Sequence, residues 1–322
     1  MNDESQYASF ECAIREWMVP IDARLTESRV QIPDRVMLAA QEFVEYCILE
    51  IEGDTKEDYF VRPWFQFIHR TIQRWYKEKY GSALHRPDDV FLGACEILGS
   101  LFQLRVPRHL RRDGEPGKTV WIVFPIDLQD EEDPANWLVN PPNLSALYSA
   151  TRRHALDEVV SVARLLRVIH NDLMTAKKPD DISQELGNNI SAHLMASAER
   201  LTDSHRPAFG LACWEAHQAV EKALKLLGRQ YRSKHRKARE IMQLFRDIQD
   251  SVTGIDEFLL QEMPARNRII EMRAGEGASV ETQEAYQIYR ISLDVTAQCT
   301  SAMQRDIWAR NAALLVKMPP WA

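Results

Sequence analysis

The chain of 322 residues carries 47 acidic and 40 basic side chains, and this net charge of -7 argues against a protein that coats DNA non-specifically. Its hydrophobic content of 45% is ordinary for a globular protein, and no run of about 18 apolar residues predicts a membrane span. The opening segment MNDESQYASFECAIREW lacks the basic and apolar regions of a secretory signal, so we expect a cytoplasmic protein.

The beginning of the chain is expected to contain two amphipathic helices. The first is predicted from Arg35, with Asp34 as its cap, to a stop at Gly53, and the second lies within residues 57–80. Aromatic residues are frequent in the second stretch, and we expect core packing for them, with partner binding as the alternative. They are Trp64, Phe65, Phe67, Trp75 and Tyr76.

Three short segments rich in β-forming residues predict a small antiparallel meander. They are residues 90–97, 100–106 and 119–126, and a helix remains an alternative for 90–98. The acidic segment DLQDEEDPANWLVNPPN at 127–143 predicts a surface loop near a domain boundary. We therefore expect an α+β domain of unknown role over residues 1–140.

Almost everything after residue 144 predicts helix. Residues 144–175 are expected to form one long helix or two, and further helices are predicted at 182–201, 213–227, 241–248, 255–259 and 280–315. Successive amphipathic helices joined by short loops fold as antiparallel bundles. The expected fold class is mainly α, with a helical bundle over residues 141–322.

Several patterns that suggest bound ligands do not fit their motifs. GEPGKT at 114–119 lacks the first glycine of a phosphate-binding loop and precedes a strand-like segment, so a hairpin turn is expected there. The acidic run DLQDEEDP predicts a solvated loop rather than a cation site. The five cysteines are scattered without a zinc or disulfide spacing and are expected to be mostly buried. No metal and no cofactor are predicted.

Positive charge is concentrated in the second half of the chain. Residues 151–322 carry 24 basic and 22 acidic side chains, whereas residues 1–150 carry 16 and 25. A run of basic residues without an acid occupies 229–239, and the run predicts either phosphate or RNA contact or a solvated surface. The run contains Arg229, Arg232, Lys234, Arg236, Lys237 and Arg239, together with His235.

The helix predicted over 207–230 places Trp214, Glu221 and Lys225 beside its apolar seam. Glu221 precedes Lys225 by four residues, the order that favours an ion pair on a helix. His217 lies on the seam itself, where we expect a hydrogen-bonded core histidine rather than a ligand.

The segments CWEAHQAVEKALKLL (213–227), RNRIIEMRAGEG (266–277) and SVETQEAYQIYRISLDV (279–295) together resemble HEPN domains over about 180–315. The resemblance implies a helical bundle that is commonly dimeric. It also implies one of three roles: a metal-independent ribonuclease of toxin and defence systems, a nucleotide-binding module, or a structural partner. The ribonuclease branch carries an arginine and a polar residue, followed by a histidine.

Arg266 and Asn267 fit the start of that pattern, but Glu271, Met272 and Arg273 occupy the positions where the histidine would fall. Cleavage without a metal needs a group that moves protons near neutral pH. Glu271 could serve only if burial raised its pKa, and His235 is the reserve candidate.

Three functions follow from these observations. We expect RNA or nucleotide phosphates to bind an arginine-rich site without catalysis, in a prokaryotic toxin or defence system. A metal-independent endoribonuclease and an assembly protein acting through a homodimer and an N-terminal protein partner are the alternatives. In the first function, the basic run is joined by three arginines near the end of the chain, which are Arg266, Arg268 and Arg273.

Overall fold

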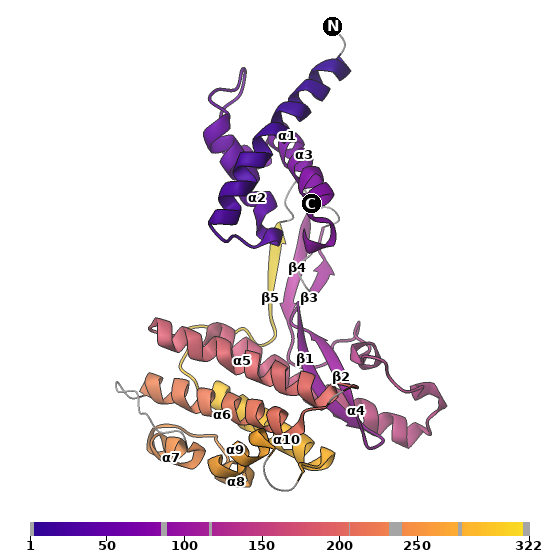
Figure 1. The fold of residues 1–322 in the computed structure, drawn as a ribbon, viewed down its shortest axis with the longest axis vertical. Coiled ribbons are helices and arrows are strands. Elements are labelled where there is room, and N and C mark those ends of the chain that lie inside the picture. Colours follow the sequence, from indigo (N-terminus) through magenta and orange to yellow (C-terminus); the bar gives the residue numbers. More distant parts are fainter. Residues whose placement is uncertain are drawn as a thin grey trace. The chain divides into compact units, whose positions relative to one another are not determined.

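The computed structural model describes residues 3–84, 89–115, 118–205, 207–231, 240–275 and 279–317 (Figure 1). The fold is mainly helical, and the chain divides into two compact units. Unit 1 contains Met1–Asp88, Asp113–Val120 and Leu315–Ala322, and unit 2 contains Asp89–Arg112 and Trp121–Leu314. The division differs from the boundary expected near residue 140, because the first two strands share a core with the helices that follow.

Helices of unit 1 pack on one hydrophobic core. They are α1 (Asp3–Glu27), α2 (Ile32–Glu42) and α3 (Pro63–Tyr80). Pro33 lies in the first turn of α2, so this helix begins before Arg35, where the sequence predicted its start. A π-helical segment, Phe43–Cys47, ends the α2 region well before Gly53. Phe65 and Tyr76 have no exposed surface, which confirms core packing for these two aromatic residues.

A buried ion-pair network also holds unit 1 together. Asp22 accepts hydrogen bonds from Lys79 Nζ at 2.7 Å, the Tyr80 hydroxyl at 2.6 Å and Arg35 Nη1 at 3.2 Å. Burial opposes ionisation of this carboxyl, but its donors outweigh that effect and hold its pKa below the usual value.

Two sheets replace the single predicted meander. Strands β1 (Val90–Ile97) and β2 (Ser100–Pro107) form an antiparallel hairpin in which Ile97 pairs with Ser100. Leu98 and Gly99 between them have φ of 54° and 75°, as a two-residue hairpin turn requires. The second sheet has the order β3-β4-β5, with bounds Leu110–Asp113, Thr119–Phe124 and Ala312–Lys317.

Strand β5 corrects the prediction of one long helix over 280–315. Helix α10 (Thr282–Ser301) ends first, and the chain then extends to pair with β4. The amide of Asn311 donates to the carbonyl of Phe124 at 2.8 Å, and Ile126 donates to Asn311 Oδ1 at 3.1 Å. Pairing with a distant strand outweighs the helix propensity of Ala and Leu in this segment.

The other helices of unit 2 are α4 (Ser149–Thr175), α5 (Asp181–Thr202), α6 (Phe209–Tyr231), α7 (Ile241–Arg246), α8 (Glu257–Glu262) and α9 (Arg266–Ala274). Helix α6 packs against α5, α9 and α10, and β1 packs on α4 and α5 (Figure 1). Ala94 and Leu104 of the hairpin are fully buried in the same core as Val159 and Leu224 of the helices. Gly93 allows this contact, because a Cβ there would lie 2.8 Å from Leu166 Cδ1.

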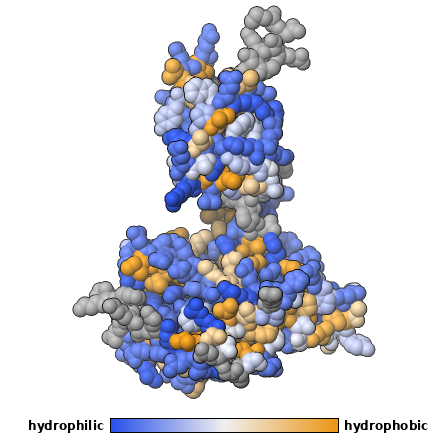
Figure 2. Space-filling view, in the orientation of Figure 1, coloured by the Kyte–Doolittle hydropathy of each residue, from blue (hydrophilic) through white to orange (hydrophobic). Residues whose placement is uncertain are grey.

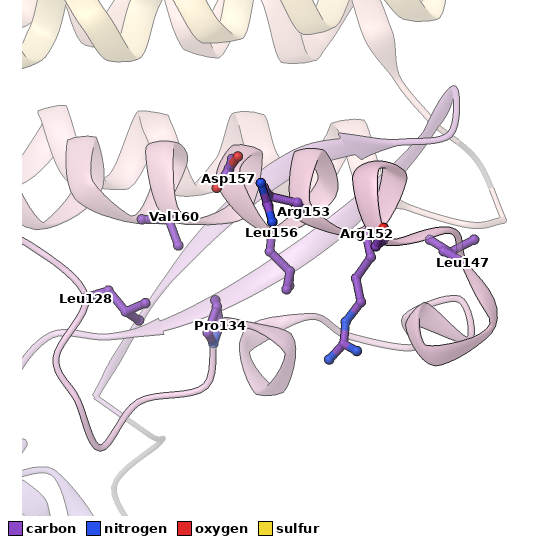
Figure 3. A pocket seen from close by; sticks show the side chains of 9 residues that line it. Leu128, Pro134, Leu147, Arg152, Arg153, Leu156, Asp157 and Val160 are labelled. Atoms are coloured by element: carbon purple, nitrogen blue, oxygen red, sulfur yellow. The ribbon is translucent and has the colours of Figure 1, made fainter.

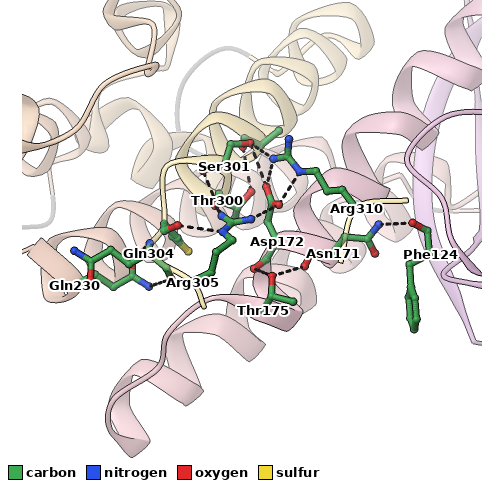
Figure 4. Close-up of polar contacts among 12 residues, drawn as sticks. Phe124, Asn171, Asp172, Thr175, Gln230, Thr300, Ser301, Gln304, Arg305 and Arg310 are labelled. Atoms are coloured by element: carbon green, nitrogen blue, oxygen red, sulfur yellow. Dashed lines mark hydrogen bonds and ion pairs between the residues drawn. The ribbon is translucent and has the colours of Figure 1, made fainter. Parts of the chain in front are cut away.

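Asp172 of α4 ties the segment after α10 to the helices (Figure 4). Arg305 and Arg310 both form ion pairs with this carboxylate, and the Ser301 hydroxyl donates to it at 3.1 Å. On the face drawn in Figure 2, hydrophobic side chains form small groups among hydrophilic ones. Among the helices that the structure describes, none has the length and apolarity to cross a membrane.

Candidate functional site

Helix α6 presents a stripe of polar, charged and aromatic side chains where α9 packs against it. Trp214, Gln218, Glu221 and Lys225 recur at intervals of four and three residues, so they lie along one face of the helix. The backbone of α9 comes close to the start of α6, because Gly210 has no side chain: a Cβ there would lie 1.9 Å from the Met272 carbonyl oxygen. This stripe and the facing residues of α9 are called the α6–α9 site below.

Glu221 is the centre of the α6–α9 site. Its side chain is only 4% exposed, and Lys225 Nζ lies 2.5 Å from its Oε1. Arg266 Nη1 approaches Oε2 to 3.3 Å, and Lys222 Nζ lies 3.9 Å from Oε1. Burial opposes ionisation of Glu221, but the hydrogen bond from Lys225 and the other cations outweigh it and hold the pKa below its usual value. One carboxylate thus faces three cations.

Trp214 carries two further cationic contacts. The guanidinium carbon of Arg273 lies 4.3 Å from the centroid of its ring, and that of Arg266 lies 5.8 Å away. Both distances are within the range of cation–π attraction. Arg266 and Arg273 are seven residues apart on α9, about two helical turns, and therefore share a face. The α6–α9 site joins Trp214 to two of the three α9 arginines that were predicted to bind phosphate.

His217 lies next to this stripe and is buried, as predicted. Its Nδ1 has no hydrogen-bond partner among the described residues, in contrast to the expected hydrogen-bonded core histidine. The ring lines a pocket of about 360 Å³, to which Arg246 and Pro264 also contribute. Burial lowers the pKa of His217 to about 4, against the favourable effect of Glu221, so the imidazole is neutral at physiological pH.

The other predicted arginines do not join the α6–α9 site. Arg229 forms an ion pair with Asp180, and its Nε lies 3.2 Å from Ser183 Oγ at the start of α5. Arg268 lies 3.7 Å from Glu271 and 3.9 Å from Glu284. Their guanidinium groups therefore already have acidic partners, which corrects the expectation that all these arginines gather at one place.

Three of the four catalytic candidates, Arg266, Asn267 and Glu271, lie on α9. Glu271 is 53% exposed and pairs with Arg268, so the burial that a proton-transfer role required is not present. Asn267 is exposed on α9. The reserve candidate His235 and the basic residues Arg232, Lys234, Arg236, Lys237 and Arg239 lie outside the residues that the structure describes.

The acidic loop is only partly the solvated loop that was predicted, because the side chain of Glu132 is 4% exposed and pairs with Arg167, which is 1% exposed. Its carboxylates form ion pairs with arginines: Glu132 with Arg167, and Asp127 with Arg164 at 3.1 Å. No group of three or more metal-ligating side chains exists within the described ranges. The five cysteines are free thiols, of which Cys95, Cys213 and Cys299 are buried.

A pocket of about 510 Å³ between the acidic loop and the start of α4 is a weaker candidate (Figure 3). Leu128, Pro134 and Leu156 give it apolar walls. Arg152 extends from α4 across this pocket, and neither Arg152 nor Arg153 has an ion-pair partner in the described part of unit 2. This pocket therefore contains arginines, but its lining has no aromatic ring such as Trp214 of the α6–α9 site.

Comparison with protein-family models, curated proteins and solved structures gives no match for this chain. The resemblance to HEPN domains stays a prediction.

Proposed function

We propose that the α6–α9 site binds RNA or nucleotide phosphates without cleaving them. The observation that carries this proposal is the pair of guanidinium groups on Trp214, next to a carboxylate with three cationic neighbours. The resemblance of the same segments to HEPN domains, some of which bind nucleotides, agrees with it.

The charge of the α6–α9 site suits a phosphate. Lys222, Lys225 and Arg266 surround Glu221, which leaves two positive charges, and Arg273 adds a third. Arg273 is exposed and has no acidic partner among the described residues, so its guanidinium can donate two parallel hydrogen bonds to phosphate oxygens. We expect this residue to make the first contact with the ligand.

Because of Trp214, we expect the α6–α9 site to prefer nucleotides to inorganic anions. Single-stranded RNA is bound by positively charged grooves in which bases stack on aromatic rings or arginine planes. The half-buried indole of Trp214 and the plane of Arg273 lie next to each other and provide both elements. Nucleoside triphosphates share this combination of base and phosphate and are the small-molecule form of the same ligand.

Absence of cleavage is proposed because the arginine at the site lacks a paired proton-transfer group. Arg266 contacts Glu221, whose ionised form is stabilised by Lys225. Glu271 forms its ion pair with Arg268 and not with Arg266. RNA incubated with the full chain in chelator should remain intact. Cleavage that His235→Ala abolishes would favour the endoribonuclease alternative.

The test is fluorescence anisotropy of labelled single-stranded RNA with the full chain at a series of salt concentrations. Affinity should fall as salt rises, with a slope of about -0.7 for each phosphate contact. Arg273→Ala should weaken binding about tenfold and reduce the slope by about 0.7, because it removes one charged contact. Light scattering of the same samples measures whether the chain forms the homodimer that the resemblance implies.

Arg268→Ala is the matched control. Arg268 lies on the same helix but pairs with Glu271 and Glu284, so its removal should leave the affinity unchanged. Equal effects of the two substitutions, or no measurable affinity at about 50 mM salt, would overturn the proposal.

A further inference from the structure

Another pocket of unit 2, of about 580 Å³, shares no lining residue with the α6–α9 site. Its walls come from Arg108 after β2, from His170 on α4, and from Lys178 between α4 and α5. Residues of α5 form the remaining wall at intervals of four, so they share one face of that helix. They are Gly187, Ser191, Met195 and Glu199.

Lys178 places in this pocket an amine that has no partner among the described residues. Its stem packs over Gly187, where a Cβ would lie 2.8 Å from Lys178 Cε, so the glycine makes room for the lysine. No hydrogen bond or ion pair joins Nζ to another residue of the described chain. Burial lowers the pKa of the amine, as expected for a cation that has lost water without gaining an anion.

Arg108, the second cation of the pocket, already forms an ion pair. Its Nε lies 3.3 Å from Asp89 Oδ1, and its guanidinium lies over the Phe91 ring at 4.5 Å. His109 shares the same carboxylate at 3.1 Å. The charge that Arg108 brings to the pocket therefore has its counter-ion.

His170 adds hydrogen-bonding capacity without charge. Its ring packs edge-on against Phe91 at 4.8 Å, and burial, with Arg108 nearby, lowers its pKa to about 4. Glu199, the acid of the lining, lies on α5 twelve residues after Gly187, which is about 18 Å of helix at about 1.5 Å per residue. It is exposed to solvent and too far along the helix to neutralise Lys178.

We propose that this pocket binds a small organic monoanion, a carboxylate with an apolar chain, whose head lies between Lys178 and Ser191. Ser191 is one helical turn from Gly187, and its hydroxyl donates to no residue in the described part of the chain. It can therefore donate to the carboxylate that pairs with Lys178.

We infer that the ligand has an apolar chain because apolar side chains line the pocket beyond Ser191. Beyond Ser191, Met195 continues the wall, and Leu173 and Met174 of α4 face it across the pocket. A single unpaired cation matches a single negative charge, so a carboxylate fits the pocket better than a phosphate dianion. Medium-chain fatty acids have this combination of head and chain.

The experiment titrates octanoate into the full chain by calorimetry, with octylamine as a ligand of equal chain and opposite charge. Octanoate should bind and octylamine should not. Lys178→Met keeps the stem over Gly187 but removes the charge, and should weaken octanoate binding about tenfold or more. Lys177→Met is the matched control, because Lys177 pairs with Asp306 at 2.7 Å and does not line the pocket.

A second measurement needs no variant. Trinitrobenzenesulfonate should modify Lys178 near neutral pH, and octanoate should protect this lysine but not Lys177, as mapped by mass spectrometry. The proposal is overturned if octanoate does not bind at millimolar concentration, if Lys178→Met binds it as tightly as the unaltered chain, or if octanol competes equally. RNA affinity should be the same in Lys178→Met, so failure of one proposal is distinguishable from failure of the other.

Discussion

Arg305 and Asp172 form an ion pair in which the two side chains are 2% and 0% exposed. Arg310 and the Ser301 hydroxyl complete the coordination of the carboxylate (Figure 4). The hydrogen bonds and ion pairs of three donors compensate the buried negative charge of Asp172. Removal of one charged partner from a buried ion pair leaves the charge of the other partner buried without a counter-ion. This network fixes the segment after α10 against α4.

Asp172→Asn should therefore destabilise unit 2 by about 3–5 kcal/mol, because it leaves Arg305 buried without an anion. The free energy of unfolding, measured by urea denaturation, checks this. Asp306→Asn is the control: its pair with Lys177 is exposed, and the expected change is within about 0.5 kcal/mol. A loss of similar size in both variants would contradict the role assigned to the network.

Two glycines of α6 should respond to alanine in opposite directions. Gly210→Ala should cost about 1–3 kcal/mol, since the new Cβ would meet the Met272 carbonyl oxygen at 1.9 Å and push α9 away. At Gly228 the nearest atom would be Ile248 Cγ2 at 3.6 Å, an ordinary contact. Gly228→Ala should stabilise the helix by about 0.5–1 kcal/mol. Thermal unfolding distinguishes the two, and stabilisation by Gly210→Ala would rule out the described packing of α9 on α6.

His217 should make stability depend on pH. Because burial lowers its pKa from 6.5 to about 4, the unfolded chain binds a proton in this window and the folded chain does not. Stability should fall as pH falls from about 6.5 to about 4, by up to about 1.4 kcal/mol per pH unit for this histidine. His170 has a similarly lowered pKa and contributes in the same direction.

His217→Gln should therefore reduce the slope of unfolding free energy against pH by up to half within that window. His154, which is exposed on α4, provides the control, and His154→Gln should leave the slope as it is. An unchanged slope in His217→Gln would mean that the ring is hydrated in the folded chain.

The cysteines should react with Ellman's reagent at three different rates. Cys12 is exposed and should react first, whereas Cys47 is half-buried and its pKa is raised by burial. Burial raises the pKa of Cys95, Cys213 and Cys299 to about 12, so these should react only on unfolding. Cys12→Ser should remove the fast phase. Fast modification of Cys213 in the native chain would show that α6 is not buried as described.

Local patterns of the sequence predicted most helices of unit 2, although none of the six predicted segments covers α9. The spacing of Cys213, Val220 and Leu224 follows one helical face, and all three are buried. The same rules failed where distant segments decide the structure. Residues 312–315 were predicted as helix but belong to a strand that pairs with β4. The β1–β2 hairpin packs in the core of the helices and is not part of a three-stranded meander. Neither pairing is encoded in a window of neighbouring residues.

The candidate site shows the same limit. The ion pair of Glu221 and Lys225 was predicted because four residues separate them, whereas the contact of Arg266 with Glu221 spans 45 residues and depends on how α9 packs. Arg268 is two residues from Arg266 and so points to another face of the helix, which helical periodicity alone could have indicated. No sequence signal marks Lys178, because its environment is created by α5 and Gly187.

The contact between Ile126 and Asn311 joins residues 185 positions apart, and the entire helical part of unit 2 lies between them. During translation, β4 therefore leaves the ribosome long before the strand that completes its edge. Until then it presents open amide and carbonyl groups to neighbouring nascent chains. We expect the interval between these two strands to be the period in which this polypeptide depends most on chaperones.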